Sequence, residues 1–109
     1  MSGATPGTMR RRVTIERPAD VDDGAGGVIR GFAPLAEAFA SVEPLSAEEA
    51  SAGRALGLNR LWRVVLRARG DLTGGHRVVW RGRRFDVLSV RALDADARFE
   101  ELLCEEIVP

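Results

Sequence analysis

The strand pattern Trp62-Arg63-Val64-Val65-Leu66-Arg67-Ala68-Arg69 is the longest run in this chain with a two-residue period. Its even-numbered residues are all apolar, whereas its odd-numbered residues are arginines except for Val65. Successive side chains of a strand point to opposite faces, so this alternation predicts a strand whose even-numbered residues face a core. Much of the remaining chain alternates in the same way, which predicts a mainly β fold.

Shorter segments with this alternation lie on both sides of that strand. In the first of them Val13 and Ile15 alternate with polar residues, and the pattern ends at Pro18. Residues rich in glycine, aspartate and proline separate the segments and predict turns. The predicted strands are residues 12–17, 28–32, 36–42, 58–69, 76–80, 84–90 and 99–108, with loops or turns at 20–27, 34, 70–75, 81–83 and 94–97.

Two features predict how these strands are arranged. In segment 36–42, Ala38, Ala40 and Val42 share one face and Phe39 lies on the other. The acidic residues of segment 99–108 are expected to face the arginines of segment 62–69 across the sheet. About six strands in so short a chain must close up or stack, because open sheet edges invite aggregation.

One segment has the pattern of a helix instead. Ser46 and Glu49 have the spacing of a capping box, and Gly57 is a suitable C-terminal stop. The apolar residues between them are mostly alanines, which bury little surface. A helix of about ten residues is too short to be stable alone in water. We therefore expect this element to depend on contacts with neighbouring elements or subunits.

Length and composition restrict the class of protein. The 109 residues suit one domain, and 16 basic and 16 acidic residues give no net charge that would draw the chain to nucleic acid or membranes. All basic residues are arginines. No run approaches the roughly 20 apolar residues of a membrane span. Residues 1–9 are expected to form a disordered arm, and residues 10–109 the domain.

The sequence does not contain a recognisable catalytic or metal-binding set. His76 is the only histidine and is expected in an exposed turn, without acidic or cysteine partners at ligand spacing. Cys104 lies among aliphatic residues, which predicts a core position. The adjacent glutamates at 48–49 and 105–106 point apart in any regular element. We expect no enzyme activity and no cofactor.

Two arginine clusters leave a nucleic-acid-binding module as an alternative function. They are Arg10-Arg11-Arg12 and a second group formed by Arg81, Arg83 and Arg84. A small barrel with basic loops is suited to gripping phosphates, but few aromatic residues are available for base stacking. The same arginines are equally suited to acidic patches on partner subunits.

Several segments, in this order and spacing, resemble the phage head-tail joining family. These are the head closure or stopper proteins of tailed phages and gene transfer agents. The chain departs from the family pattern at Phe39, where Trp is common, and at Gly31-Phe32, where a bulkier aromatic pair is usual. The segments that carry the resemblance are 11–17, 23–28, 39–46 with Glu48-Glu49, 77–87 and 101–106.

The resemblance implies a small β-barrel of about six to seven antiparallel strands with one inserted short helix or loop at residues 43–59. It also implies a homo-oligomeric ring of about six subunits, with about twelve as the alternative. The ring would lie at the head-tail interface of a virion or phage-like particle assembled in the bacterial cytoplasm. Its neighbours would be adaptor or portal proteins above and tail terminator or tail tube proteins below.

In such a ring the protein would close the DNA channel after packaging and provide the platform on which the tail docks. DNA would pass through without sequence-specific binding. The residues expected at the channel are Glu43, Ser46, Glu48, Glu49, Arg54 and Leu56. Those expected between adjoining rings are Arg10, Arg11, Arg12, Asp22, Asp23, Arg81 and Arg83.

Overall fold

The computed structural model describes residues 9–46 and 60–107, and within these ranges the protein is built from strands and contains no helix. The predicted helix after Ser46 lies outside the described residues. The strands are β1 (Arg11–Pro18), β2 (Val21–Asp22), β3 (Val28–Ile29), β4 (Phe32–Pro44), β5 (Leu61–Arg67), β6 (Arg77–Trp80), β7 (Arg83–Ala92) and β8 (Phe99–Ile107).

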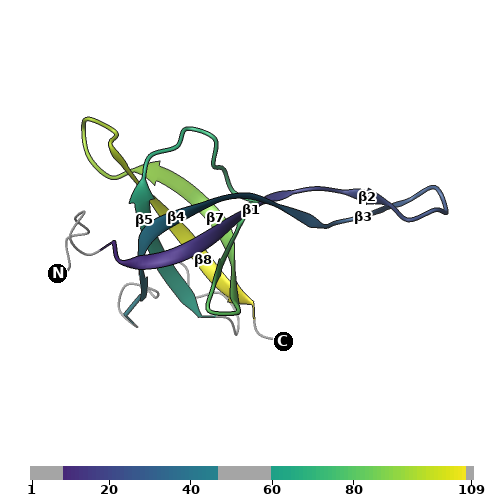
Figure 1. Ribbon diagram of the computed structural model, residues 1–109, viewed down its shortest axis with the longest axis horizontal. Coiled ribbons are helices and arrows are strands. Elements are labelled where there is room, and N and C mark those ends of the chain that lie inside the picture. The colour runs from purple at the N-terminus through teal and green to yellow at the C-terminus, as the bar shows by residue number, and fades with distance from the viewer. Residues whose placement is uncertain (1–8, 47–59, 108–109) are drawn as a thin grey trace.

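Six of these strands form a closed antiparallel barrel in the order β1-β4-β5-β8-β7-β6 (Figure 1). The barrel closes where β1 pairs with the short strand β6, with Ile15 opposite Val78. Closure removes the unpaired edges that an open sheet would expose. The predicted barrel is therefore confirmed. The acidic strand β8 pairs with β5, as expected, and with β7 on its other side.

The barrel interior contains most of the residues that the alternation placed there. Ala68 is an exception, since β5 ends at Arg67 and Ala68 is exposed. Val65, which the alternation placed on the opposite face, is completely buried. Val13 and Ile15 of β1 and Trp62, Val64 and Leu66 of β5 are buried. They form one cluster with the inward residues of the other strands, which include Ala40, Val78, Phe85, Val87, Leu102 and Cys104. No polar or charged residue of the described chain is buried in it. Hydrophobic burial thus holds the barrel together.

Two tight features join the strands at the ends of the barrel. Arg81 and Gly82 both have positive φ, 54° and 77°, and connect β6 to β7 as a two-residue hairpin turn. The sequence predicted a hairpin with a connection at residues 81–83, but Arg83 already belongs to β7. The second feature is the loop between β5 and β6, residues 68–76. It packs Leu72 against the core, with 6% of the Leu72 surface exposed.

The predicted turn at Pro34 is wrong, because β4 runs without interruption from Phe32 to Pro44. Pro34 pairs with Glu16 at an irregularity of the β1–β4 ladder, where the register shifts by one residue. Proline lacks a backbone N–H and is tolerated at such bulges. The shift lets a long strand contain a proline and still pair with β1 on both sides of it.

Residues 19–31 form a hairpin that extends away from the barrel, and we call it the finger (Figure 1). The sequence predicted residues 20–27 as a loop, but Val21 and Asp22 belong to β2 and pair with Ile29 and Val28 of β3. The longest dimension of the protein is 50 Å, against 29 and 26 Å for the other two. The finger accounts for this elongation, since the barrel alone has the form of a short cylinder.

Replacement of Leu102 by alanine tests the core assignment. Leu102 is completely buried between β5 and β7, so L102A should lower the free energy of unfolding by about 2–5 kcal/mol. The matched control is L88A, because Leu88 is 44% exposed and should change it by less than about 0.5 kcal/mol. Equal effects in chemical denaturation would contradict the assignment.

Candidate functional site

The residues predicted to act in assembly are distributed over three places in the structure. Glu43 and Ser46 lie where β4 ends and the insertion begins. The arginines lie at the start of β1 and around the β6–β7 turn, and Asp22 and Asp23 lie on the finger. The remaining predicted channel residues, Glu48, Glu49, Arg54 and Leu56, lie outside the described residues.

The insertion begins and ends on adjacent, hydrogen-bonded strands. The backbone N–H of Leu45 donates to the carbonyl of Leu61 at 3.0 Å, which extends the β4–β5 ladder to the edge of the insertion. On the other side of β5, the N–H of Glu106 donates to the carbonyl of Arg60 at 2.9 Å. The two ends of the insertion are therefore fixed by the barrel wall, independently of the segment between them.

A row of alternating charges crosses the barrel wall beside this base, and we call it the charged row: Glu43, Arg63, Glu101 and Arg91 on β4, β5, β8 and β7. Arg63 contacts Glu43 at 3.1 Å and Glu101 at 2.9 Å, and Arg91 contacts Glu101 at 2.7 Å. The Arg63–Glu101 pair confirms the predicted pairing of acidic and basic strands. The carboxylate of Glu43 is thus already matched by a guanidinium on the neighbouring strand.

Glu106 links β8 to β5 and β7 near the β6–β7 turn. Its carboxylate accepts hydrogen bonds from Arg83 at 2.7 and 2.9 Å and from the Trp62 indole N–H at 3.1 Å. The Arg83 guanidinium also lies 4.7 Å from the centre of the Trp62 ring, which packs edge-on against Phe85. The hydrogen bond from Arg83 lowers the pKa of Glu106, and Arg83 has its own pKa raised in return.

The structure brings together three of the predicted arginines around Trp80. The guanidinium carbons of Arg11, Arg81 and Arg83 lie 5.7, 5.2 and 6.0 Å from the centre of its ring. β1 and β6 are neighbours in the barrel, which is why residues so distant in sequence meet. Arg12 lies elsewhere, paired with Glu37 of β4 at 2.8 Å. We call the group around Trp80 the arginine cluster.

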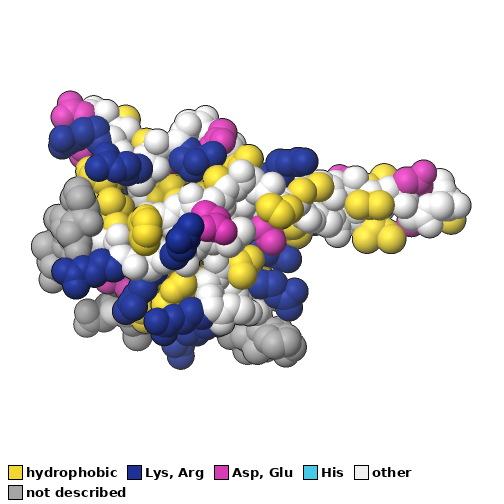
Figure 2. Space-filling view, in the orientation of Figure 1, with side chains coloured by type: hydrophobic (Ala, Val, Ile, Leu, Met, Phe, Trp, Pro, Cys, Tyr) yellow, Lys and Arg dark blue, Asp and Glu magenta, His cyan; other side chains and the backbone are white. Residues whose placement is uncertain are grey.

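The finger carries exposed apolar side chains that sequence reasoning assigned no role. Val21, Val28 and Ile29 are 58%, 67% and 58% exposed. Figure 2 shows hydrophobic side chains gathered along the projecting hairpin, away from the arginines of the barrel. The signal in the sequence was a set of β-branched residues flanking a loop rich in aspartate and glycine.

Two aspartates accept the hydrogen bonds that order the tip of the finger. Asp23 Oδ1 accepts hydrogen bonds from the N–H groups of Ala25 at 2.7 Å and Gly27 at 2.9 Å, and Asp22 accepts one from Gly24. These bonds to the charged form lower the pKa of Asp23. Its predicted position in an exposed loop is confirmed, and the carboxylate stabilises the backbone of that loop.

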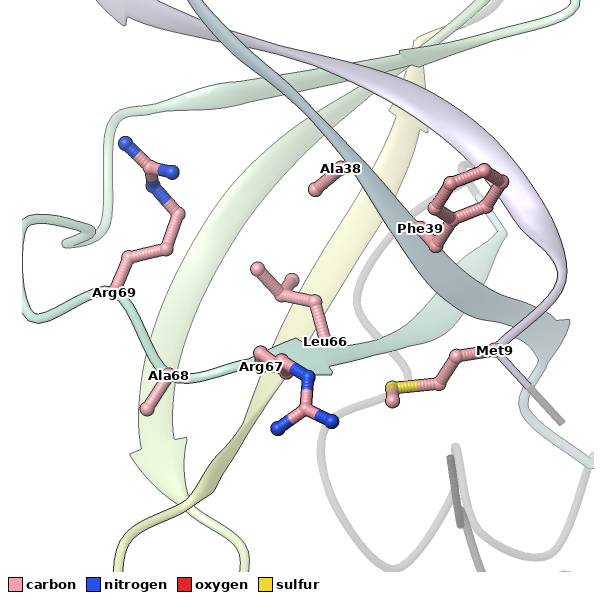
Figure 3. A pocket seen from close by; sticks show the side chains of 7 residues that line it. All are labelled: Met9, Ala38, Phe39, Leu66, Arg67, Ala68 and Arg69. Atoms are coloured by element: carbon pink, nitrogen blue, oxygen red, sulfur yellow. The ribbon is translucent and has the colours of Figure 1, made fainter. Parts of the chain in front are cut away.

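The wall of the barrel opens into a notch where β4 and β5 separate. Ala40 pairs with Leu66, but beyond this pair β4 continues beside β1 while β5 turns away. The space between them has a volume of about 460 Å³ and is shown in Figure 3. We call it the β4–β5 notch, and its lining residues are Met9, Ala38, Phe39, Leu66, Arg67, Ala68 and Arg69.

The remaining candidate groups have structural positions. Cys104 is completely buried, as predicted, and burial raises the pKa of its thiol. His76 is half-buried rather than exposed, and its Nδ1 lies 3.1 Å from the carbonyl oxygen of Thr73 in the same loop. Among residues 9–46 and 60–107, no three histidine, cysteine or acidic residues are grouped to hold a metal ion. The same residues contain no helix able to cross a membrane.

The sequence of the chain identifies its family. Residues 4–107 match the family described as phage head completion protein. The chain belongs to this family. It therefore has a structural role in the phage head, is a component of a virion or virion-like particle, and assembles with other head or tail proteins. This confirms the resemblance drawn from the segments between residues 11 and 106. No curated protein matches the chain.

Two solved structures have the same fold. The solution structure of protein SF1141 from Shigella flexneri 2a superimposes with a TM-score of 0.74 at 27% identity, covering 94% of this chain and 96% of that one. A chain of the virion of a native gene transfer agent particle superimposes with a TM-score of 0.71 at 20% identity, covering 100% of both chains. This chain thus shares its overall fold with both structures.

Replacement of Glu106 by glutamine tests the ion pair between Glu106 and Arg83. A carboxylate whose pKa is lowered by folding stabilises the protein above its unfolded pKa of about 4.3, and this contribution is lost as the pH falls through the folded value. E106Q should melt at a lower temperature at pH 7, and its difference from the wild type should shrink below about pH 4. The control E37Q removes an exposed ion pair and should change little at either pH. A pH-independent difference for E106Q would contradict this.

Replacement of Asp23 by alanine tests the order of the finger tip. D23A removes the acceptor of two backbone N–H groups, so amide exchange at Ala25 and Gly27 should accelerate while the barrel amides keep their protection. D20A is the matched control, because no hydrogen bond or ion pair involves Asp20 within the described residues. Equal exchange in both variants, measured by NMR, would contradict the role of Asp23.

Proposed function

We propose that the protein forms a ring between the portal-adaptor and the tail, where it closes the DNA channel after packaging and provides the tail docking platform. In this proposal the barrel is a rigid scaffold and residues 43–59 line or block the channel. The observation that carries it is the base of the insertion. The N–H of Leu45 and the carbonyl of Leu61 hold its two ends together on a wall braced by the charged row.

A rigid base and a weakly anchored segment are the two requirements of a channel-closing element. The segment between Ser46 and Gly57 is rich in alanine, and small side chains bury little apolar surface. Such an element adopts two positions that differ by a few kcal/mol, whereas a leucine-packed helix would be fixed in one. In a ring, one small change per subunit is repeated around the channel, which suits a signal from an arriving tail.

The contacts with DNA and with adjoining rings follow from the available charges. Because Glu43 is matched by Arg63, we assign it to fixing the base of the insertion and not to repelling DNA phosphates. Within the insertion, Glu48 and Glu49 repel phosphates and Arg54 attracts them, a mixture that permits DNA to slide. Together with Arg10 and Arg12, the arginine cluster is assigned to adjoining rings, where acidic partner surfaces would match it.

Deletion of residues 47–56 tests the channel-closing role. Particles carrying the deletion should package DNA but release it, because the ring remains and its closing element is missing. DNA retention is measured by nuclease protection of purified particles. A melting temperature of the deleted chain close to that of the wild type is the control for an intact barrel. Full protection of the DNA in deletion particles would overturn the proposal.

The arginine cluster supports a second candidate, a nucleic-acid-binding module, because guanidinium groups stacked on an indole can contact both phosphates and bases. Binding of single- or double-stranded DNA at two salt concentrations separates the candidates. A nucleic-acid module would lose affinity steeply between about 50 and 200 mM salt, and R81E would weaken binding further. An assembly protein would show no binding that depends on Arg81.

A further inference from the structure

We propose that the finger of one copy docks into the β4–β5 notch of the next copy, and that repetition of this head-to-tail contact builds the ring. The inference rests on the proposed function, to which it adds the contact between subunits. It also reassigns Asp22 and Asp23 from contacts between rings to contacts between copies within one ring. Four observations on the described residues carry it.

The first observation is that the finger has apolar side chains and no partner. β2 and β3 pair only with each other within the described residues, so neither strand is covered by the barrel. Val21, Val28 and Ile29 are each more than half exposed. Exposed β-branched residues on a hairpin with open edges are costly in a monomer and are typical of a surface that another chain covers.

The second observation is that the notch offers an apolar surface of suitable size. Met9, Ala38, Phe39 and Ala68 supply its apolar lining above the completely buried Leu66, and Arg67 and Arg69 also line it (Figure 3). Phe39 is 59% exposed although it is one of the largest apolar residues of the chain. A volume of about 460 Å³ accommodates a few aliphatic side chains of a hairpin. Apolar side chains of the finger would thus bury the surface that the notch leaves exposed.

The third observation is that the charges of the two surfaces are complementary. Asp20, Asp22 and Asp23 are close together on the finger, and none forms an ion pair with another described residue. At the notch, the Arg67 guanidinium contacts only the face of Phe99, at 5.7 Å, and has no carboxylate partner within the described residues. The finger therefore carries more acidic than basic residues, three aspartates against Arg30, beside its apolar side chains. In the proposed contact they face a free cation beside apolar residues in the notch.

The fourth observation is the relative position of the two surfaces. The finger extends from one side of the barrel, and the C-terminal end of β5, which carries Arg67, lies on the opposite side (Figure 1). The finger cannot reach the notch of its own chain, but it extends far enough beyond the barrel to reach a neighbour. A contact between two different surfaces is heterologous, and repeated heterologous contacts close into rings when the rotation permits.

Cross-linking between two single-site variants tests the contact directly. V28C places a thiol on the finger and F39C places one in the notch. The native Cys104 does not compete, because it is completely buried and its thiol pKa is raised. The two variants carry tags of different mass and are mixed, then treated with a short bismaleimide reagent. This reagent tolerates imperfect alignment better than a disulfide, which requires Cβ atoms within about 4.5 Å.

The proposal predicts a V28C–F39C product in the mixture and little product from either variant alone. The mixture is tested as purified protein from about 1 μM to about 1 mM, a range that covers weak interfaces, and in assembled particles. A product from V28C alone would indicate that fingers pair edge to edge, and it would overturn the inference. A ring without the mixed product would also overturn it but leave the proposed function standing. The absence of any ring in particles would overturn both.

Charge reversal at the notch tests the electrostatic part of the contact. R67E in the F39C chain should reduce the yield of mixed product by about three- to tenfold, because a matched pair becomes a repulsive one. R84E is the matched control, since Arg84 is exposed on β7 and forms no ion pair within the described residues. Equal yields for R67E and R84E would contradict the role assigned to Arg67.

Discussion

The double pairing of β4 is the constraint on which the rest of the structure depends. Its N-terminal part pairs with β1 and its C-terminal part with β5, and Ala40 is the residue at which the two ladders meet. The stagger between these ladders is what allows the sheet to tilt and close as a barrel. It also leaves space where β5 turns away from β4, and this space is the β4–β5 notch.

The residues that stabilise the barrel differ from those assigned to contacts with other chains. The core is apolar throughout the described residues, so the barrel does not require a ligand or a buried charge to fold. The finger leaves this shell as a hairpin between β1 and β4. None of its residues belongs to the described core, so the finger is available for contact with other chains without weakening the barrel.

Arginine is suited to the surface of this barrel for a physical reason. The Arg77 guanidinium lies 3.8 Å from the centre of the Phe32 ring and 3.1 Å from Asp86, and Arg83 contacts Trp62 and Glu106 in the same way. A planar guanidinium can stack on an aromatic face while its N–H groups donate to a carboxylate, which an ammonium group cannot do. Arg12 is engaged in the same way, since its guanidinium lies 5.9 Å from the centre of the Phe39 ring and 2.8 Å from Glu37.

Local sequence by itself determined most of the residues that face the core, with Val65 and Ala68 as exceptions, and the position of the β6–β7 turn. Trp62, Cys104 and the Arg81-Gly82 turn were predicted correctly, because alternation and positive φ are properties of neighbouring residues. The predicted turn at Pro34 was wrong, since the bulge that tolerates the proline exists only when β1 pairs with β4. The arginine cluster, the finger and the notch were decided by tertiary structure alone. Each arises from the register between segments distant in sequence, and register is fixed by hydrogen bonds and packing that no local pattern contains.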